Sequence, residues 1–148
     1  MNLAGDTFRS KLVESLPDVG VARFNDAHEK LVHIIVDIDV VLEKMLSQQV
    51  EQAAWDQLGD LITSLVQYTK QHFEDEERAM AQNGYPSVAE HKQQHEKLVA
   101  ELIAFQQGVL AQNEELTIKM RSWLLEWLLV HIKNFDLAYR PTLEGKVA

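Results

Sequence analysis

Histidines and carboxylates recur along this chain at spacings that would place them on one side of a helix. His91 and His95 lie four residues apart, and His72 and Glu76 repeat that spacing. At about 3.6 residues per helical turn, the members of each pair project from the same side, about one turn apart. Neutral imidazole and carboxylate are ligands that suit iron, manganese and zinc. These pairs therefore predict metal binding. The rest of the sequence can support or exclude that prediction.

Three further candidate ligands lie on other segments. His28 and His131 each fall on the apolar stripe of a predicted helix. Asp136 follows His131 by five residues, a step that turns the side chain roughly 140° round a regular α-helix. Both residues can face one site only if the helix loosens or ends between them. We therefore predict a π-type or frayed turn there.

The free-energy cost of burying these side chains without partners indicates that they bind a metal. An unpartnered buried polar group costs roughly 1–3 kcal/mol, and a buried charge costs more. A divalent metal satisfies imidazoles and carboxylates directly, and the interior of a helix bundle is a known place to hold two ions. Seven ligands are too many for one ordinary ion, whereas two carboxylates can bridge a pair. We predict a dinuclear site with the candidate ligands His28, His72, Glu76, His91, His95, His131 and Asp136.

Composition limits the alternatives. The chain has 148 residues, a formal net charge of −9 and no basic block, which argues against nucleic acid or an anionic membrane as a partner. It has no cysteine, so thiolate metal sites and iron–sulfur clusters are excluded. The first residues lack the unbroken apolar run of a secretory signal. We expect a soluble, cytoplasmic protein with a single core.

Four segments carry apolar residues at every third or fourth position, the pattern of one buried helical stripe. They begin near Phe24, Glu51, Ser87 and Asn113, and the first runs to Met45 and the second to Met80. The sequence Asn83-Gly84-Tyr85-Pro86 is a strong helix stop. Ser87 with Glu90 predicts a capping box, and Asn113 predicts a second helix cap.

Four long amphipathic helices joined by short connections favour an all-α, antiparallel up-down four-helix bundle with the di-metal site in its core. We assign residues 21–138 to this bundle and residues 1–20 to an N-terminal extension. Residues 139–148 are expected to form a C-terminal tail that is irregular beyond Arg140-Pro141.

The same residues resemble the hemerythrin family, specifically its bacterial single-domain members. The resemblance covers about residues 20–136, and no ligand position is missing. The shared pattern consists of Gly20-Val21, Phe24-Asn25 and His28; His72-Phe73, Glu76-Glu77 and Met80; Gly84-Tyr85-Pro86, His91 and His95; and Trp127-Leu128, His131-Ile132 and Asp136.

The resemblance implies a division of labour between two iron ions. One iron would take His91, His95 and His131, and the other only His28 and His72. Glu76, Asp136 and an oxo or hydroxo group would bridge them. The second iron would then have an open position that accepts dioxygen. Trp127, Leu128 and Ile132 would line the dioxygen pocket, although their spacing fits ordinary core residues equally well.

The chain departs from the commonest family pattern at a few positions. Asn25 stands where an aspartate is frequent, which predicts an altered hydrogen bond around the His28 ligand. His33 falls five residues past His28 and off the apolar stripe, so we expect it in solvent rather than on metal. Glu77 and Asp75 are also expected to be solvated.

The leading function is reversible dioxygen binding for carriage, storage, delivery or sensing, and we expect no primary enzymatic role. The alternative is a di-iron redox enzyme that acts on peroxide, nitric oxide or ferrous iron. A metal-free helical module that recruits partners is the third hypothesis, and it leaves the inward histidines unexplained. The sequence is compatible with a monomer and leaves the oligomeric state open.

Overall fold

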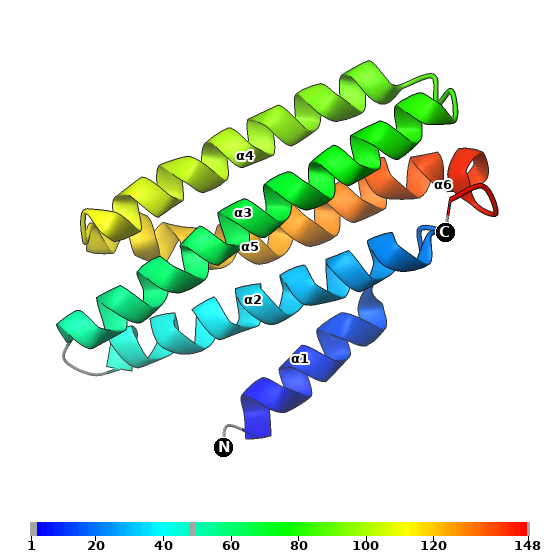
Figure 1. Cartoon of the computed structure of the whole chain (residues 1–148). Coiled ribbons are helices and arrows are strands. Elements are labelled where there is room, and N and C mark those ends of the chain that lie inside the picture. Colours follow the sequence, from blue (N-terminus) through cyan, green and yellow to red (C-terminus); the bar gives the residue numbers. More distant parts are fainter. Residues whose placement is uncertain (1–2, 48–49, 148) are drawn as a thin grey trace.

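The computed structural model describes residues 3–47 and 50–147, and its four long helices form an antiparallel bundle (Figure 1). Short connections reverse the chain between successive helices, so each helix packs beside its neighbours in sequence. The predicted all-α fold is confirmed. The helices are α2 (Ala22–Ser47), α3 (Gln52–Gln82), α4 (Val88–Leu110) and α5 (Glu114–His131).

The apolar stripes of these helices meet along the bundle axis. At the end of the bundle that includes the α2–α3 connection, the interior is filled almost entirely by hydrocarbon, and we call this end the apolar half. Its buried side chains belong to one hydrophobic cluster that is shielded from water, as the hydrophobic effect favours. Fully buried members are Ile38, Leu58, Ile62, Leu65, Leu102, Met120 and Leu124.

Helix ends follow the predicted turn chemistry in two of three places. Helix α3 ends before Gly84, whose φ of 70° lies in the left-handed region that glycine adopts without strain. Asn113 caps α5, because its Oδ1 accepts from the backbone N–H of Leu116 at 3.1 Å. The capping box at Ser87 is wrong: its side chain makes no capping hydrogen bond, and its ψ of 24° differs from the extended backbone of most caps.

Helix α1 (Leu3–Ser15) precedes the bundle and lies against α2 (Figure 1). Arg9 fastens it there, with Nη2 2.6 Å from Oδ1 of Asp37 and Nη1 3.2 Å from the backbone oxygen of His33. The His33 side chain is 43% exposed and lies outside the cluster of predicted ligands. The N-terminal segment therefore includes a docked helix.

The C-terminal segment is more ordered than the sequence predicts. A π-helical turn, η1 (Ile132–Asp136), leads directly into α6 (Leu137–Leu143). The expected irregular tail beyond Pro141 is wrong for residues up to Leu143, because α6 continues through the proline. Tyr139 and Leu143 are completely buried, and α6 packs against α3. Among the residues that the structure describes, no helix is long and apolar enough to cross a membrane.

Candidate metal centre

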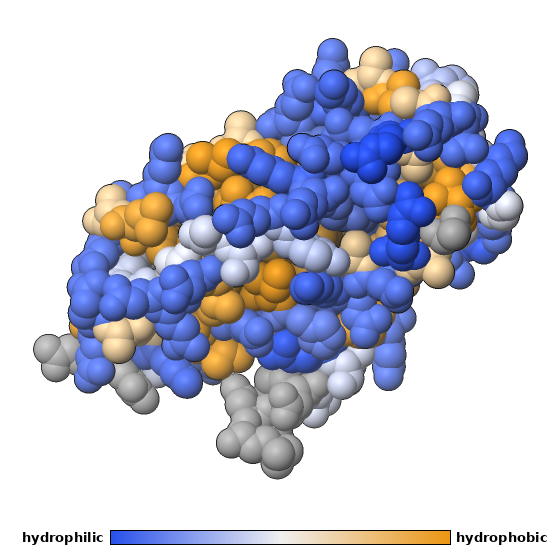
Figure 2. All heavy atoms as spheres, in the orientation of Figure 1, coloured by the Kyte–Doolittle hydropathy of each residue, from blue (hydrophilic) through white to orange (hydrophobic). Residues whose placement is uncertain are grey.

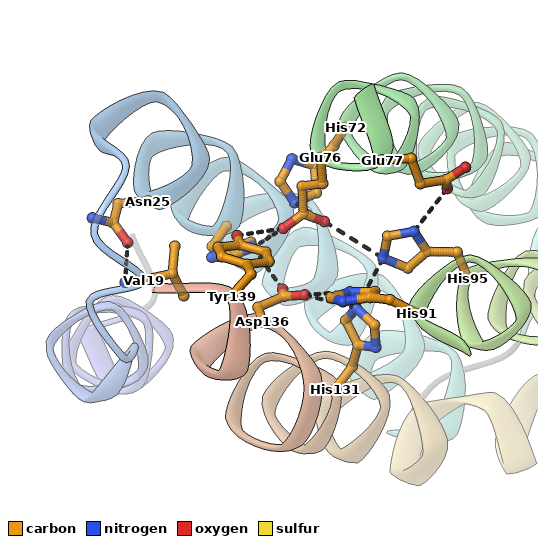
Figure 3. A network of polar contacts seen from close by, with 11 residues as sticks. Val19, Asn25, His72, Glu76, Glu77, His91, His95, His131, Asp136 and Tyr139 are labelled. Atoms are coloured by element: carbon orange, nitrogen blue, oxygen red, sulfur yellow. Dashed lines mark hydrogen bonds and ion pairs between the residues drawn. The ribbon is translucent and has the colours of Figure 1, made fainter. Parts of the chain in front are cut away.

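The seven predicted ligands meet inside the bundle at the end opposite the apolar half, and we call this end the ligand half (Figure 3). Helix α2 supplies one of them, α3 and α4 two each, α5 one and η1 one. None is more than 5% exposed. The cluster comprises His28, His72, Glu76, His91, His95, His131 and Asp136.

Asp136 lies between imidazoles from three helices. Its Oδ1 atom is 2.9 Å from Nε2 of His91 and 3.1 Å from Nε2 of His131. Its Oδ2 atom is 3.1 Å from Nε2 of His28. Each carboxylate oxygen therefore faces a different group of histidines, as a bridging ligand would require.

Glu76 occupies a similar place on α3. Its Oε1 atom lies 3.2 Å from Nε2 of His72 and 3.5 Å from Nε2 of His95. Its Oε2 atom lies 3.7 Å from Nε2 of His28 and accepts a hydrogen bond from Tyr139 at 2.6 Å. This carboxylate also contacts imidazoles on both sides of the cluster.

Two overlapping sets of donor atoms follow from these positions, and within each set all donor atoms lie within 4.8 Å of one another. Both sets contain Glu76 and Asp136. The first set adds three imidazoles and the second adds two. The arrangement suits two ions that share both carboxylates and differ by one imidazole. The imidazoles are His91, His95 and His131 in the first set, and His28 and His72 in the second.

The π turn explains how His131 and Asp136 reach the same place. In a π turn, residues five apart come into line, whereas a regular α-helix would rotate them apart. The structure has this turn at Ile132–Asp136, and Asp136 is completely buried. The predicted local irregularity is confirmed.

Charge is concentrated in this interior. Burial disfavours protonation of His28, but the carboxylates of Asp136 and Glu76, whose oxygens lie 3.1 and 3.7 Å from its Nε2, outweigh that effect and raise the pKa of His28 to about 9. Burial acts against ionisation of Asp136, yet the neighbouring histidines, His131 first, hold the pKa of its carboxyl well below the usual value. The site therefore favours ionised carboxylates together with a positive charge.

Several buried nitrogen and oxygen atoms of the cluster have no hydrogen-bond partner, and they indicate the source of that positive charge. Nε2 of His28, His72 and His91, Oε1 of Glu76 and both oxygens of Asp136 are buried without a hydrogen-bond partner. Buried polar groups in native proteins are normally satisfied, so these atoms indicate a bound ligand. Imidazole nitrogens and carboxylate oxygens together fit divalent iron, manganese or zinc.

Comparison with known proteins places the chain. The family described as "Hemerythrin HHE cation binding domain" matches residues 19–143. The chain belongs to the hemerythrin family. A bacteriohemerythrin of Stenotrophomonas maltophilia (strain R551-3) is 32% identical over 132 residues, which cover 86% of this chain and 78% of the relative. A myohemerythrin of Riftia pachyptila is 32% identical over 82 residues, covering 55% and 62% of the two chains.

A solved hemerythrin structure agrees with this assignment. The structure titled "Crystal structure of hemerythrin:wild-type" superposes on this chain with a TM-score of 0.67 at 26% sequence identity. The match covers 86% of this chain and 92% of the other. The hemerythrin fold therefore extends over nearly all of the described bundle.

Tyr139 is a site residue of this hemerythrin-family chain that sequence reasoning missed. Its hydroxyl donates to Oε2 of Glu76 from α6, and the sequence had placed this residue in the C-terminal tail, outside the bundle. Burial and the carboxylate charges of Glu76 and Asp136 raise the pKa of the Tyr139 hydroxyl, so it remains a donor. Its position three residues beyond Asp136 was the available signal.

One expectation about residues around the ligands is corrected. Glu77 is only 20% exposed, and its Oε2 lies 2.8 Å from Nδ1 of His95, so it is not a solvated side chain. Asn25 accepts a hydrogen bond from Val19 N–H and donates one to Asp18, so it holds the loop before α2 (Figure 3). Nδ1 of His28 has no hydrogen-bond partner among the described residues, which agrees with the altered hydrogen bond expected there. Asp75, by contrast, lies at the edge of the bundle, where it pairs with Arg23.

The predicted pocket residues lie in the core of this hemerythrin-family bundle. Trp127, Leu128 and Ile132 are all buried. The Trp127 and His131 rings lie 6.4 and 5.4 Å from the Phe73 ring, measured between centroids. Trp127 therefore packs one aromatic layer away from the histidine cluster.

Proposed function

We propose that this chain binds dioxygen reversibly at two non-haem iron ions, for carriage, storage, delivery or sensing. Hemerythrins are oxygen-binding non-haem iron proteins, and the chain belongs to that family. One observation carries the proposal: the two donor sets share both carboxylates but contain three and two imidazoles. The set with fewer imidazoles leaves one coordination position open for a small exogenous ligand.

The ligand assignment follows from the two sets. His91, His95 and His131 would hold one iron, and His28 and His72 the other. Glu76 and Asp136 would bridge the pair, together with an oxo or hydroxo group. Bound ferrous ions would supply the electrons that reversible dioxygen binding requires.

The chain's own residues would control access and orientation. Trp127, Leu128 and Ile132 would keep the open side dry, which limits irreversible oxidation and loss of the bound gas to side reactions. Tyr139 would hold Glu76 in its bridging orientation through the 2.6 Å hydrogen bond. Carboxylate-rich di-iron sites that activate oxygen use more glutamates and fewer histidines, so five imidazoles favour binding over activation.

The test begins with metal-free full-length protein reconstituted with ferrous iron under anaerobic conditions. We expect about two irons per chain. Repeated cycles of oxygen and inert gas should then make the iron charge-transfer bands appear and disappear without loss of amplitude. An oxygen electrode should record stoichiometric uptake with no continued consumption.

Two matched histidine variants sharpen this test. His28→Ala removes a ligand from the two-imidazole set and should abolish the gas-dependent bands. His33→Ala changes a half-exposed histidine outside the cluster and should leave them intact. Steady oxygen consumption, or bands that do not reverse, would instead support a redox enzyme.

A further inference from the structure

A groove runs between α3 and α4 and reaches the buried ligand His95. Its volume is about 480 Å³, and charged residues at its rim surround an apolar floor that includes Phe73 and Val99. Figure 2 shows apolar side chains gathered along the line where these two helices meet. Glu77 lies in this groove with His95, so it stands between the solvent and the metal centre.

Glu77 and His95 make a direct contact through the side of the imidazole that faces away from the cluster. Oε2 of Glu77 is 2.8 Å from Nδ1 of His95. A carboxylate only accepts hydrogen bonds, so the hydrogen of a neutral His95 ring belongs on Nδ1. Nε2, which lies 3.5 Å from Oε1 of Glu76 and 3.2 Å from Nε2 of His131, then presents its lone pair to the interior (Figure 3).

His95 is held more firmly than other imidazoles of the cluster. The Phe73 ring stacks on it at 3.7 Å between centroids and an interplanar angle of 3°. Phe73 therefore fixes the plane of the ring, and Glu77 fixes its rotation within that plane. By contrast, Nδ1 of His28, His91 and His131 has no hydrogen-bond partner.

We propose that Glu77 is a positioning residue that makes the three-imidazole site the tighter of the two metal sites. The inference rests on the proposed metal pair, and it assigns the order in which the two sites fill. A carboxylate on the far nitrogen of a ligating histidine fixes the tautomer and increases the basicity of the ligand. Loss of such a partner typically weakens metal affinity by about 10–100-fold.

The experiment titrates metal-free full-length protein with Co²⁺ and follows its ligand-field bands together with the heat of binding. The unmodified chain should bind in two steps of unequal affinity. Glu77→Gln keeps a hydrogen-bond acceptor but removes the charge, and should weaken the tighter step by about tenfold while leaving the weaker step unchanged. Glu77→Leu should weaken the tighter step further. Glu74→Gln, which alters an exposed carboxylate on the same groove, should change neither step.

A second measurement reads the tautomer directly. Long-range ¹H–¹⁵N spectra of the zinc-loaded chain should place the His95 hydrogen on Nδ1 in the unmodified protein and in Glu77→Gln. The Glu77→Leu variant should lose the hydrogen-bonded Nδ1–H signal. Far-ultraviolet circular dichroism confirms helicity, and the nearly isosteric Gln variant decides the matter if the Leu variant does not fold.

The proposal is overturned if Glu77→Gln and Glu74→Gln bind Co²⁺ with the same two affinities. It is also overturned if the weaker step alone responds to the change at Glu77. A chain that shows the expected Co²⁺ dependence but takes up no oxygen as the diferrous form would contradict the proposed function and leave the role of Glu77 standing.

Discussion

The two halves of the bundle are built from the same four helices, but different kinds of side chain fill their interiors. In the apolar half, side chains such as Leu58 and Leu102 are fully buried against other hydrocarbon. In the ligand half, imidazoles and carboxylates occupy the equivalent inward positions, and several of their atoms lack partners. Helical periodicity therefore decides which residues point inward, but the residue types decide whether the interior can close without a cation.

The energetic consequences of the two halves are opposite. Full burial of a leucine side chain contributes roughly 1.5–3 kcal/mol, whereas each unpartnered buried polar group costs roughly 1–3 kcal/mol. The apolar half should sustain the fold by itself. The ligand half should contribute its full stability only when a metal ion satisfies the imidazoles and carboxylates.

The largest expected effect is loss of both metals in Asp136→Ala. This carboxylate belongs to both donor sets, so its removal takes a ligand from each site at once. Metal analysis after reconstitution should find less than one ion per chain, against about two in the unmodified protein. Asp75→Ala, which changes an aspartate paired with Arg23 at the edge of the bundle, serves as the control and should retain the full metal content.

Leu102→Ala, a change in the apolar half, should lower the stability of the fold and leave metal binding unchanged. Leu102 is completely buried, so truncation should lower the free energy of unfolding by about 2–5 kcal/mol. Urea unfolding of metal-free and metal-loaded protein measures this loss, which should be similar in both forms. Metal content should stay unchanged, and a drop in metal content would show that the two halves are not independent.

Metal affinity should rise with pH because a proton competes at His28. The pKa of His28 in the metal-free fold is about 9, so below that pH a proton must leave before metal binds. The affinity of the site that contains His28 for Co²⁺ should rise roughly tenfold per pH unit toward pH 9 and then level off. Calorimetry in buffers of different ionisation heats counts the released protons, and His28→Gln should release one fewer.

The proton on His28 opposes metal binding, but it should stabilise the metal-free fold. A raised histidine pKa contributes stability that is complete below the unfolded value of 6.5 and is lost as the pH rises through about 9. Urea midpoints of metal-free protein should therefore fall across this range. A midpoint that rose across it would contradict the charge arrangement around His28.

Of these changes, Tyr139→Phe should have the smallest effect on metal binding and stability. The change removes one hydrogen bond to the charged Glu76 carboxylate, worth about 1.5–3 kcal/mol at most, and keeps the ring that fills the core. Both metals should still bind, with the iron charge-transfer bands shifted because Glu76 is less constrained. Spectra identical to those of the unmodified protein would show that Tyr139 serves packing alone.

The bundle and the ligand cluster could be predicted from sequence because both depend on angular position around a helix. The five-residue step from His131 to Asp136 even predicted the π turn, since no regular helix could bring both inward. Ser87 was misassigned because a capping box depends on backbone angles that its sequence pattern does not fix.

Glu77 and Tyr139 escaped prediction for different physical reasons. Glu77 lies about 100° round α3 from Glu76, and only the packing of α4 decides whether that direction meets His95 or water. Pro141 suggested that the helix had ended, because proline cannot donate the helical hydrogen bond. In the structure α6 runs through it, and the neighbouring Tyr139 is buried.

The π turn behaves like a one-residue insertion in an otherwise regular helix. Deleting one residue between His131 and Asp136 would restore the four-residue spacing seen in His91 and His95. If the full-length segment instead formed a regular α-helix without this deletion, all that follows would rotate by about 100°, and Tyr139 would turn out of the core with Asp136. The π turn thus accommodates the extra residue and sets the angular phase of the C-terminal helix as well as the position of a ligand.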